Sequence, residues 1–219
     1  MPRVRTRMAC EHAAMLLGSL ALVFGSKPEE PRTSVSAADD TIHCPSRVAE
    51  LPSSPLFDPA DPRLRSPALL VVHKSERRLM LFARGSLKHC LRIGLGFEPR
   101  GDKRREGDGK TPEGWYRTSD KPWSSFAAAI AVHYPNVADA HDAHRGGLIS
   151  RRVRDEIVTA HDRGRIPPQR TTMGGEILIH GGGSTRDWTL GCVALDDDDL
   201  NTLRRDLPRT MRTDLLVLP

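Results

Sequence analysis

Residues 177–195 read ILIHGGGSTRDWTLGCVAL, an apolar run, a glycine-rich loop and a second apolar run. His180 ends the first run, and Cys192 opens the second run twelve positions later (192 minus 180). Short apolar runs on either side of a glycine-containing turn indicate a pair of strands. The pattern therefore predicts an imidazole and a thiol that face each other across a hairpin.

A thiol attacks a carbonyl only as the thiolate, and a nearby imidazole can take its proton, so a Cys/His pair suits acyl transfer. Three glycines follow His180 and permit close approach of a substrate to the backbone. Gly191 frees the peptide bond that enters Cys192 to point its N–H group at an oxyanion. A glycine-rich turn with a buried cysteine and a hydrogen-bonded histidine is the alternative interpretation.

From residue 68 onward the chain alternates short apolar segments with turns, which predicts a mainly β domain with one or two short helices. The first three predicted strands form an antiparallel meander. The acidic run at 196–199 is interpreted as the start of a helix, because acidic side chains favour helix N-termini and no calcium-loop spacing accompanies them. The predicted strands cover 68–74, 78–83, 87–94, 111–116, 126–134, 176–180 and 214–218, and the predicted helices cover 153–163 and 200–205.

The first 67 residues differ from this domain. Arg3, Arg5 and Arg7 precede an uncharged apolar run of twelve residues at 13–24, which predicts a secretory signal peptide at 1–26. That run is shorter than the ~20 apolar residues that a spanning helix needs. Residues 27–67 are rich in proline and polar side chains and predict a linker. We therefore expect a signal peptide, a linker and a catalytic domain at 68–219, exported to the periplasm or cell envelope, with no stable membrane span after cleavage.

Export implies an oxidising compartment. The exported chain would keep three cysteines, and a Cys44–Cys90 disulfide would leave Cys192 as the reactive thiol, although two buried thiols would give the same pattern. The net charge of +5 is scattered along the chain and favours anionic surroundings such as wall polymer or lipid headgroups. Nucleic acid is excluded as a partner, because no stretch interleaves aromatic and basic side chains.

Three segments carry a resemblance to a known family: the opening strands, the TPEGWY segment at 111–116, and the His-Gly and Thr-Leu-Gly-Cys-Val pieces at 180–181 and 189–193. Together they resemble the L,D-transpeptidases of the YkuD type. A branch of this family with Tyr-Pro-Asn and Trp-Thr-x-Gly-Cys segments is the most similar, through residues 134–136 and 188–192. Leu190 and Ala194 depart from the common pattern, which has His at the first position and Arg or Asn at the second.

The resemblance implies an L,D-transpeptidase-like β-sandwich or barrel that acts on peptidoglycan stem peptides in wall cross-linking or remodelling, and so in cell shape. Cys192 would be the nucleophile and His180 the base, without a metal or organic cofactor. His180 would be oriented by the carbonyl of Gly181 or by Asp187.

The backbone N–H groups of Gly191 and Cys192 would bind the oxyanion. Thr189, Trp188 and Tyr134 are expected to contribute to substrate binding, although a buried aromatic side chain is the more common explanation for Trp188 and Tyr134.

Other functions remain open from the sequence. Hydrolysis of wall peptides, as a carboxypeptidase or amidase, needs the same residues with water as the acceptor. A sortase-like transpeptidase would use His133, Cys192 and Arg204 or Arg205, but would leave His180 unexplained. A zinc site is disfavoured, because structural zinc prefers ligand pairs two to four residues apart. A wall-binding module with an incidental thiol is the non-enzyme alternative.

Overall fold

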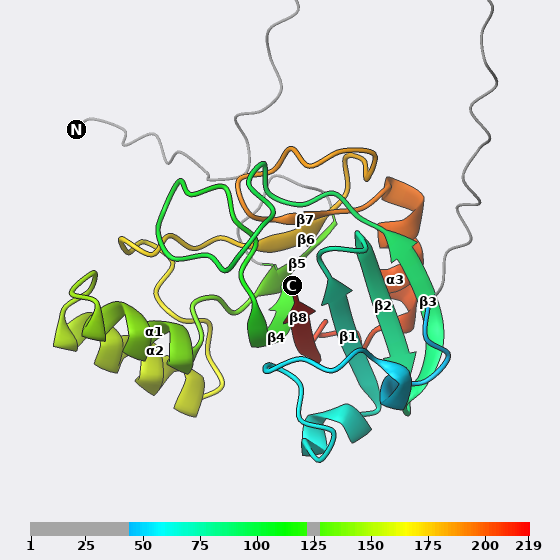
Figure 1. Ribbon diagram of the computed structural model, residues 1–219, viewed down its shortest axis with the longest axis horizontal. Helices are drawn as coiled ribbons and strands as arrows, with labels where there is room; N and C mark the ends of the chain where they lie inside the picture. Colours follow the sequence, from blue (N-terminus) through cyan, green and yellow to red (C-terminus); the bar gives the residue numbers. More distant parts are fainter. Residues whose placement is uncertain (1–43, 122–127) are drawn as a thin grey trace, which may run out of the picture.

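The computed structural model describes residues 44–121 and 128–219 (Figure 1). The predicted signal peptide and the first part of the predicted linker lie outside these residues. The described elements, in chain order, are η1 (Val48–Glu50), η2 (Pro62–Arg65), β1 (Ala68–His73), β2 (Arg78–Ala83), β3 (Ser86–Arg92), β4 (Gly114–Asp120), β5 (Ala129–Val132), α1 (Val137–Arg145), α2 (Arg151–Asp162), β6 (Leu178–His180), β7 (Val193–Ala194), α3 (Asp197–Asp206) and β8 (Asp214–Leu218).

The strands form one sheet in the order β3-β2-β1-β8-β4-β5-β6-β7. β1, β2 and β3 make the predicted antiparallel meander. β8 lies between β1 and β4, parallel to the first and antiparallel to the second. The sheet curls, so that β6 and β7 run across the direction of β1 and β2 (Figure 1). The mainly β fold class is confirmed, but the described residues contain three α-helices where the sequence predicts one or two.

The central strands are buried on both faces, which explains why their sequences are almost continuously apolar. In β1, Leu70 and Val72 point into the main core. Leu69 and Val71 point the other way, into a second apolar cluster that also receives Phe82 of β2. The sheet therefore needs a cover on each side.

Residues 44–67 supply the cover over the second cluster. Val48, Leu51, Phe57 and Leu64 of this segment are buried there, and the indole N–H of Trp115 donates to the backbone carbonyl of residue 56 at 3.0 Å. Proline-rich composition predicts a linker over 27–67, whereas 44–67 packs on the sheet. The reason is that its few apolar residues, scattered among prolines, all reach the same face.

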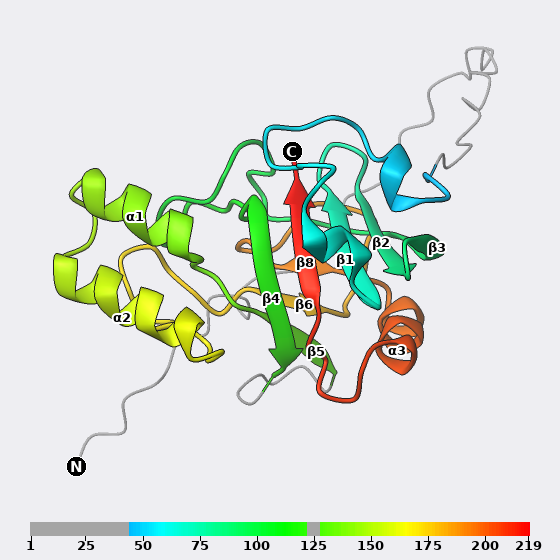
Figure 2. The ribbon, with the colours of Figure 1, turned by 90° about the horizontal axis from the view of Figure 1, so that it is seen from below.

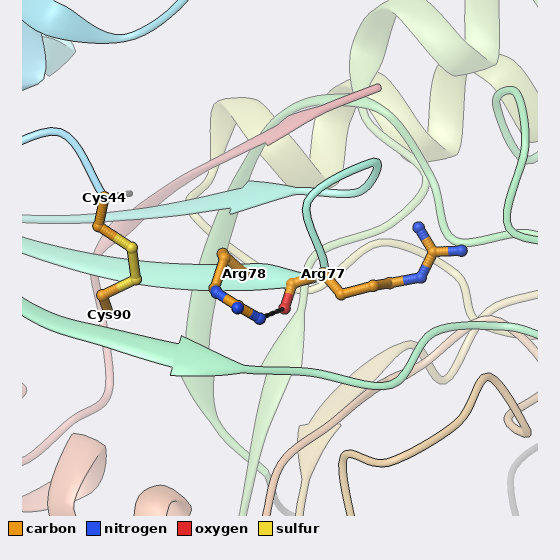
Figure 3. The surroundings of a disulfide bond; sticks show 4 residues. All are labelled: Cys44, Arg77, Arg78 and Cys90. Carbon is orange, nitrogen blue, oxygen red and sulfur yellow. Dashed lines mark hydrogen bonds between the residues drawn. A yellow bond between two sulfur atoms is a disulfide. The ribbon is translucent and has the colours of Figure 1, made fainter. Parts of the chain in front are cut away.

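A disulfide joins this cover to the sheet. Cys44, which begins the described residues, is bonded to Cys90 of β3 (Figure 3). The pairing predicted from the cysteine count is confirmed. It closes a loop of 46 residues and fixes the start of the covering segment to the edge strand of the sheet.

Two of the helices begin near the residues that the sequence indicates. Ser150 caps α2 by accepting the N–H of Val153 at 3.3 Å. Asp197, Asp198 and Asp199 form the first turn of α3, as the acidic run predicts.

The first helix was not predicted, because α1 buries a single alanine, Ala140, and its other residues lack apolar spacing. Its start is encoded by Asn136 and Asp139, each of which accepts the other's backbone N–H at 2.8 Å in a capping box. α1 and α2 form a hairpin at one side of the sheet, beyond β4 (Figure 2).

Candidate active site

The strands that carry His180 and Cys192 are parallel, not the antiparallel arms of a hairpin. β6 pairs with β7 in the register Ile179 to Val193 and His180 to Ala194. The loop between them is long enough to return the chain to the start of β6, so both strands run the same way. The predicted hairpin is therefore wrong.

Paired residues of parallel strands point to the same face, and so do residues two apart along a strand. Cys192 precedes Val193 and so lies opposite Leu178, two residues before His180. The Cys192 sulfur and the His180 imidazole consequently share one face of the β6–β7 pair. Strand spacings of about 4.8 Å across and 6.6 Å along give about 8 Å between their Cα atoms, which two side chains can bridge.

The sulfur of Cys192 lies in a polar notch of backbone groups. The N–H group of Leu178 donates to Sγ at 3.4 Å, and the carbonyl oxygen of Glu176 lies 3.7 Å from Sγ. The side chain is buried, and Ala129, Ala131 and Leu178 surround it. An N–H group directed at sulfur favours the thiolate, which is the reactive form.

His180 is held by the residue that follows it. Its Nδ1 lies 2.6 Å from the carbonyl oxygen of Gly181. A carbonyl can only accept, so Nδ1 carries the proton and Nε2 is the basic nitrogen. Burial lowers the pKa of His180 from its ordinary value, partly offset by the Gly181 carbonyl and the charge of Asp197. The ring is therefore a neutral base at pH 7.

Asp187, the other group predicted to orient His180, serves a different purpose. Its carboxylate accepts the guanidinium of Arg77 at 2.7 Å and the N–H of Leu95 at 2.9 Å. Arg77 lies in the turn between β1 and β2, which sequence spacing alone could not connect to Asp187. This ion pair ties the loop between His180 and Cys192 to the rest of the sheet.

The loop that enters Cys192 is fixed by Thr189. Its hydroxyl donates to the carbonyl of Cys192 at 2.7 Å and accepts the N–H of Gly191 at 3.1 Å. The Gly191 N–H, predicted to bind an oxyanion, is thus directed at Thr189. Thr189 therefore holds the backbone on both sides of the bond that enters Cys192.

Gly191 is required by geometry. Its φ is +125°, and a Cβ placed on it would lie 2.6 Å from the carbonyl oxygen of Lys110. The charged loop at 101–110 therefore packs backbone to backbone against the residue before Cys192. Gly96 makes a similar approach, since a Cβ there would lie 2.0 Å from the carbonyl oxygen of Gly109.

Two buried ammonium groups hold that loop, and sequence reasoning missed both. Lys103 pairs with Asp108 at 2.9 Å, and Lys74 pairs with Glu113 at 2.7 Å while also donating to the Thr111 carbonyl at 2.9 Å. Both lysine side chains are almost fully buried. The available signals were a lysine directly after an apolar strand, Lys74, and a lysine within a glycine-rich charged loop, Lys103.

The pKa of Asp108 reflects the hydrogen bonds and the ion pair that hold this loop. Burial alone would raise it, but the N–H groups of Arg105 and Arg104 and the ammonium of Lys103 outweigh burial and hold the pKa below its ordinary value. The carboxylate accordingly stays charged and keeps its four contacts.

The two predicted aromatic residues lie in different surroundings. Trp188 is half-buried, and its ring meets that of His180 edge to face with centroids 5.6 Å apart. Its indole N–H donates to the Gly183 carbonyl at 3.1 Å. Tyr134 is completely buried in the main core, and its hydroxyl donates to the Met173 carbonyl at 3.3 Å. Trp188 therefore lies beside His180, and Tyr134 lies in the core.

The family model of the L,D-transpeptidase catalytic domain (YkuD) matches residues 67–213 of the chain. The chain belongs to this family. A comparison with curated protein sequences gives no match. Within 44–121 and 128–219, no helix is long and apolar enough to cross a membrane, and no group of three or more His, Cys, Asp or Glu side chains could hold a metal ion.

Solved structures with a similar fold include three proteins. The helical cell shape determining protein Pgp2 from Campylobacter jejuni has 23% identity and a TM-score of 0.45, covering 68% of this chain and 46% of that one. An L,D-transpeptidase from Xylanimonas cellulosilytica has 16% identity and a TM-score of 0.43, covering 71% and 62%. An L,D-transpeptidase from Mycobacterium tuberculosis has 11% identity and a TM-score of 0.40, covering 70% and 58%. The chain thus spans less than two thirds of the length of each.

Proposed function

We propose that this L,D-transpeptidase domain acts on peptidoglycan stem peptides, with Cys192 as the nucleophile and His180 as the base. The observation that carries the proposal is the parallel β6–β7 pair, which puts both side chains on one face while the Gly181 carbonyl holds the His180 proton on Nδ1. Nε2 is then the nitrogen that can take a proton from the thiol.

The reaction divides into two acyl transfers. In the first, His180 Nε2 takes the thiol proton, and the thiolate attacks the amide carbonyl at the L-centre of a diamino acid in the stem peptide. The C–N bond to the terminal D-amino acid breaks, the proton passes from His180 to the leaving amine, and a thioester on Cys192 remains. In the second, an acceptor amine attacks the thioester, His180 takes its proton, and the thiolate is released.

The tetrahedral intermediate needs a donor for its oxygen. The Cys192 N–H group is the candidate, because Thr189 accepts the neighbouring Gly191 N–H. The ring of Trp188 meets the His180 ring edge to face and would lie beside a bound substrate. No step requires a metal ion or an organic cofactor.

The proposal also includes location. A stem peptide is reached outside the cytoplasmic membrane, so the enzyme would be exported to the periplasm or cell envelope, as the signal-peptide prediction requires. The Cys44–Cys90 disulfide supports this, because disulfides persist in oxidising compartments.

Incubation with a purified tetrapeptide muropeptide, followed by mass analysis, tests the reaction. Cross-linked dimers would show transfer to a second stem peptide, and tripeptide alone would show hydrolysis, the alternative with water as acceptor. Unchanged substrate would contradict both.

Acylation by a carbapenem tests the residues. We expect one adduct per chain, located on Cys192, absent in Cys192→Ser and formed about 10²–10⁴-fold more slowly in His180→Ala, which is the usual contribution of a general base. His89→Ala, on β3 at the far edge of the sheet, is the matched control and should react like the wild type. Equal rates for His180→Ala and the wild type would contradict the assignment of the base.

A further inference from the structure

A cavity of about 250 Å³ lies where β8 begins. Its lining includes Arg117 of β4, His133 after β5, Gly164 after α2, and Arg212 and Asp214 at the start of β8. His133 is at the opposite end of β5 from Ala129, which pairs with His180. Four residues of strand span about 13 Å, so this cavity is separate from the candidate active site.

The sheet register places three of the lining side chains in one row. The N–H of His133 donates to the carbonyl of Arg117 at 2.8 Å, and Arg117 pairs with Asp214 across β4 and β8. Residues directly opposite each other on neighbouring strands point to the same face of the sheet. Arg212 precedes Asp214 by two residues and borders the same cavity. Two guanidinium groups and one imidazole therefore converge on this space, with a single carboxylate beside them.

The two guanidinium groups have no counter-charge of their own. Within residues 44–121 and 128–219, neither Arg117 nor Arg212 forms an ion pair or a side-chain hydrogen bond. The carboxylate of Asp214 instead accepts the hydroxyl of Ser66 at 2.9 Å. Both arginine side chains are exposed and can turn toward a ligand. Like charges around one cavity repel each other, and an anion between them removes that cost.

The imidazole of His133 supplies a third polar group, and only 4% of this residue is exposed. Its Nε2 lies 2.9 Å from the hydroxyl of Ser119, and that hydroxyl donates its own proton to the carbonyl of Asp120 at 3.2 Å. Nε2 therefore carries the proton of the neutral ring. Nδ1 carries a lone pair, for which the described part of the chain supplies no donor, and the ring borders the cavity.

The charges around His133 keep its ring neutral while the cavity is free of anions. Burial, and then the charges of His161, Arg212 and Arg117, lower the pKa of the ring to about 4. Asp214 acts in the opposite direction, but one carboxylate against two guanidinium groups leaves the cavity positive. An anion held there would oppose the arginine charges and raise the pKa of His133, so that Nδ1 takes a proton from water and becomes a donor.

We propose that this cavity binds a dianion of the phosphate class, held by the guanidinium groups of Arg117 and Arg212 and by His133, which gains a proton at Nδ1 when the anion binds. The planar guanidinium offers two parallel N–H donors to phosphate oxygens. Free phosphate and the phosphate monoester of a larger molecule share this chemistry. The site uses neither Cys192 nor His180, so the inference is independent of the proposed function.

Calorimetric titration of the full chain at low ionic strength tests the site, with inorganic phosphate, methyl phosphate and acetate as the probes. Arg117→Gln and Arg212→Gln each remove one guanidinium group, and Arg92→Gln, at the exposed end of β3, removes the same charge elsewhere. We expect phosphate to bind the wild type and Arg92→Gln equally, and each cavity variant about tenfold or more weakly. Thermal unfolding without ligand should be unchanged in all three variants, because the replaced side chains are exposed.

Sulfate tests the role of His133, because sulfate remains a dianion at every pH near neutrality. We expect saturating sulfate to raise the pKa of the wild-type His133 ring, followed by NMR, by about one pH unit or more. The same addition should leave the pKa of this ring unchanged in Arg117→Gln and in Arg212→Gln. The measurement uses the wild-type ring, so it does not depend on a variant of a buried residue.

The phosphate probes also distinguish the two sources. Tighter binding of methyl phosphate than of phosphate would assign the ligand as a monoester, and equal or weaker binding would assign it as free phosphate. The proposal would be overturned if phosphate did not bind saturably, if both cavity variants bound it like the wild type, or if Arg92→Gln lost affinity equally. Acetate that binds as tightly as phosphate, or a His133 pKa that saturating sulfate does not move, would also overturn it.

Discussion

Thr189 fixes the backbone conformation of the loop that enters Cys192. One hydroxyl serves two backbone groups, as a donor to the Cys192 carbonyl and as an acceptor for the Gly191 N–H. The residue is buried, so neither group could turn to water if the hydroxyl were removed. The direction of the Cys192 N–H group therefore depends on a side chain that takes no part in the chemistry.

We expect Thr189→Val to destabilise the protein by about 1–3 kcal/mol, because two buried backbone groups lose their partner. Acylation of Cys192 should slow by about 10²-fold as the oxyanion donor turns away. Thr189→Ser keeps the hydroxyl and should recover most of the rate. Thr185→Val, an exposed threonine in the same loop, is the control. Carbapenem acylation and urea unfolding measure the two effects, and a Thr189→Ser variant as slow as Thr189→Val would contradict the role of the hydroxyl.

The residues of the site that could be predicted are those whose partners are close in sequence. The Gly181 carbonyl follows His180 directly, and the Gly191 and Thr189 positions lie within three residues of Cys192. Asp187 could not be assigned in this way, because its partner Arg77 is 110 residues away. The same holds for Lys110, whose carbonyl makes a glycine necessary at position 191.

At the scale of elements, periodicity identifies strands but not their neighbours. The apolar runs around His180 and Cys192 are both strands, yet β6 and β7 are parallel, because direction is set by the path of the loop between them. α1 was missed for a different reason. The residues of its capping box are close in sequence, but the helix has too few apolar residues to give a helical apolar pattern. Composition also gives a wrong prediction for residues 44–67. The segment is rich in proline, but a few of its apolar side chains are buried against the sheet and hold it there.

The covering segment is the element whose attachment can be tested most directly. Replacing both Cys44 and Cys90 by serine opens a loop of 46 residues, and we expect a loss of about 2–4 kcal/mol in the free energy of unfolding. Carbapenem acylation of Cys192 in the folded variant should keep its wild-type rate, because the segment covers the other end of the sheet. Guanidinium unfolding measures the first effect. An unchanged midpoint would show that packing alone holds the segment.

At the scale of the whole molecule, two buried groups respond to acid in opposite ways. Burial, and then the charges of His161, Arg212 and Arg117, lower the pKa of His133 from 6.5 to about 4. Between these values the unfolded chain binds the proton and the folded protein does not, so stability falls as the pH falls from 6.5 toward 4.

The pKa of Asp139 is shifted in the opposite direction to that of His133. Burial, helped by Asp102 and opposed by the Asn136 N–H, raises the pKa of Asp139 from 3.8 to about 7. Its folded form binds a proton that the unfolded chain lacks, so its contribution to stability is present at low pH and is lost as the pH rises through 7. Across the interval from about pH 4 to pH 6.5 the two groups offset each other.

We therefore expect the free energy of unfolding of the wild type to depend weakly on pH between 4.5 and 6.5. Asp139→Asn should lose stability as the pH falls through this range, and His133→Gln should gain it, each by up to about 3 kcal/mol. Urea unfolding at four or five pH values measures the slopes. If both variants keep the wild-type slope, the two groups do not titrate as their surroundings indicate.

The position of β8 has a consequence for how the protein is made. This strand occupies the middle of the sheet, between β1 and β4, although it follows all the other strands in sequence. Until residues 214–218 have been synthesised, the two halves of the sheet have no common neighbour, and the edges of β1 and β4 stay open. A nascent chain would thus remain without its completed sheet until synthesis has passed β8, and a truncation before residue 214 should leave two half-sheets that can pair with other chains instead of with each other.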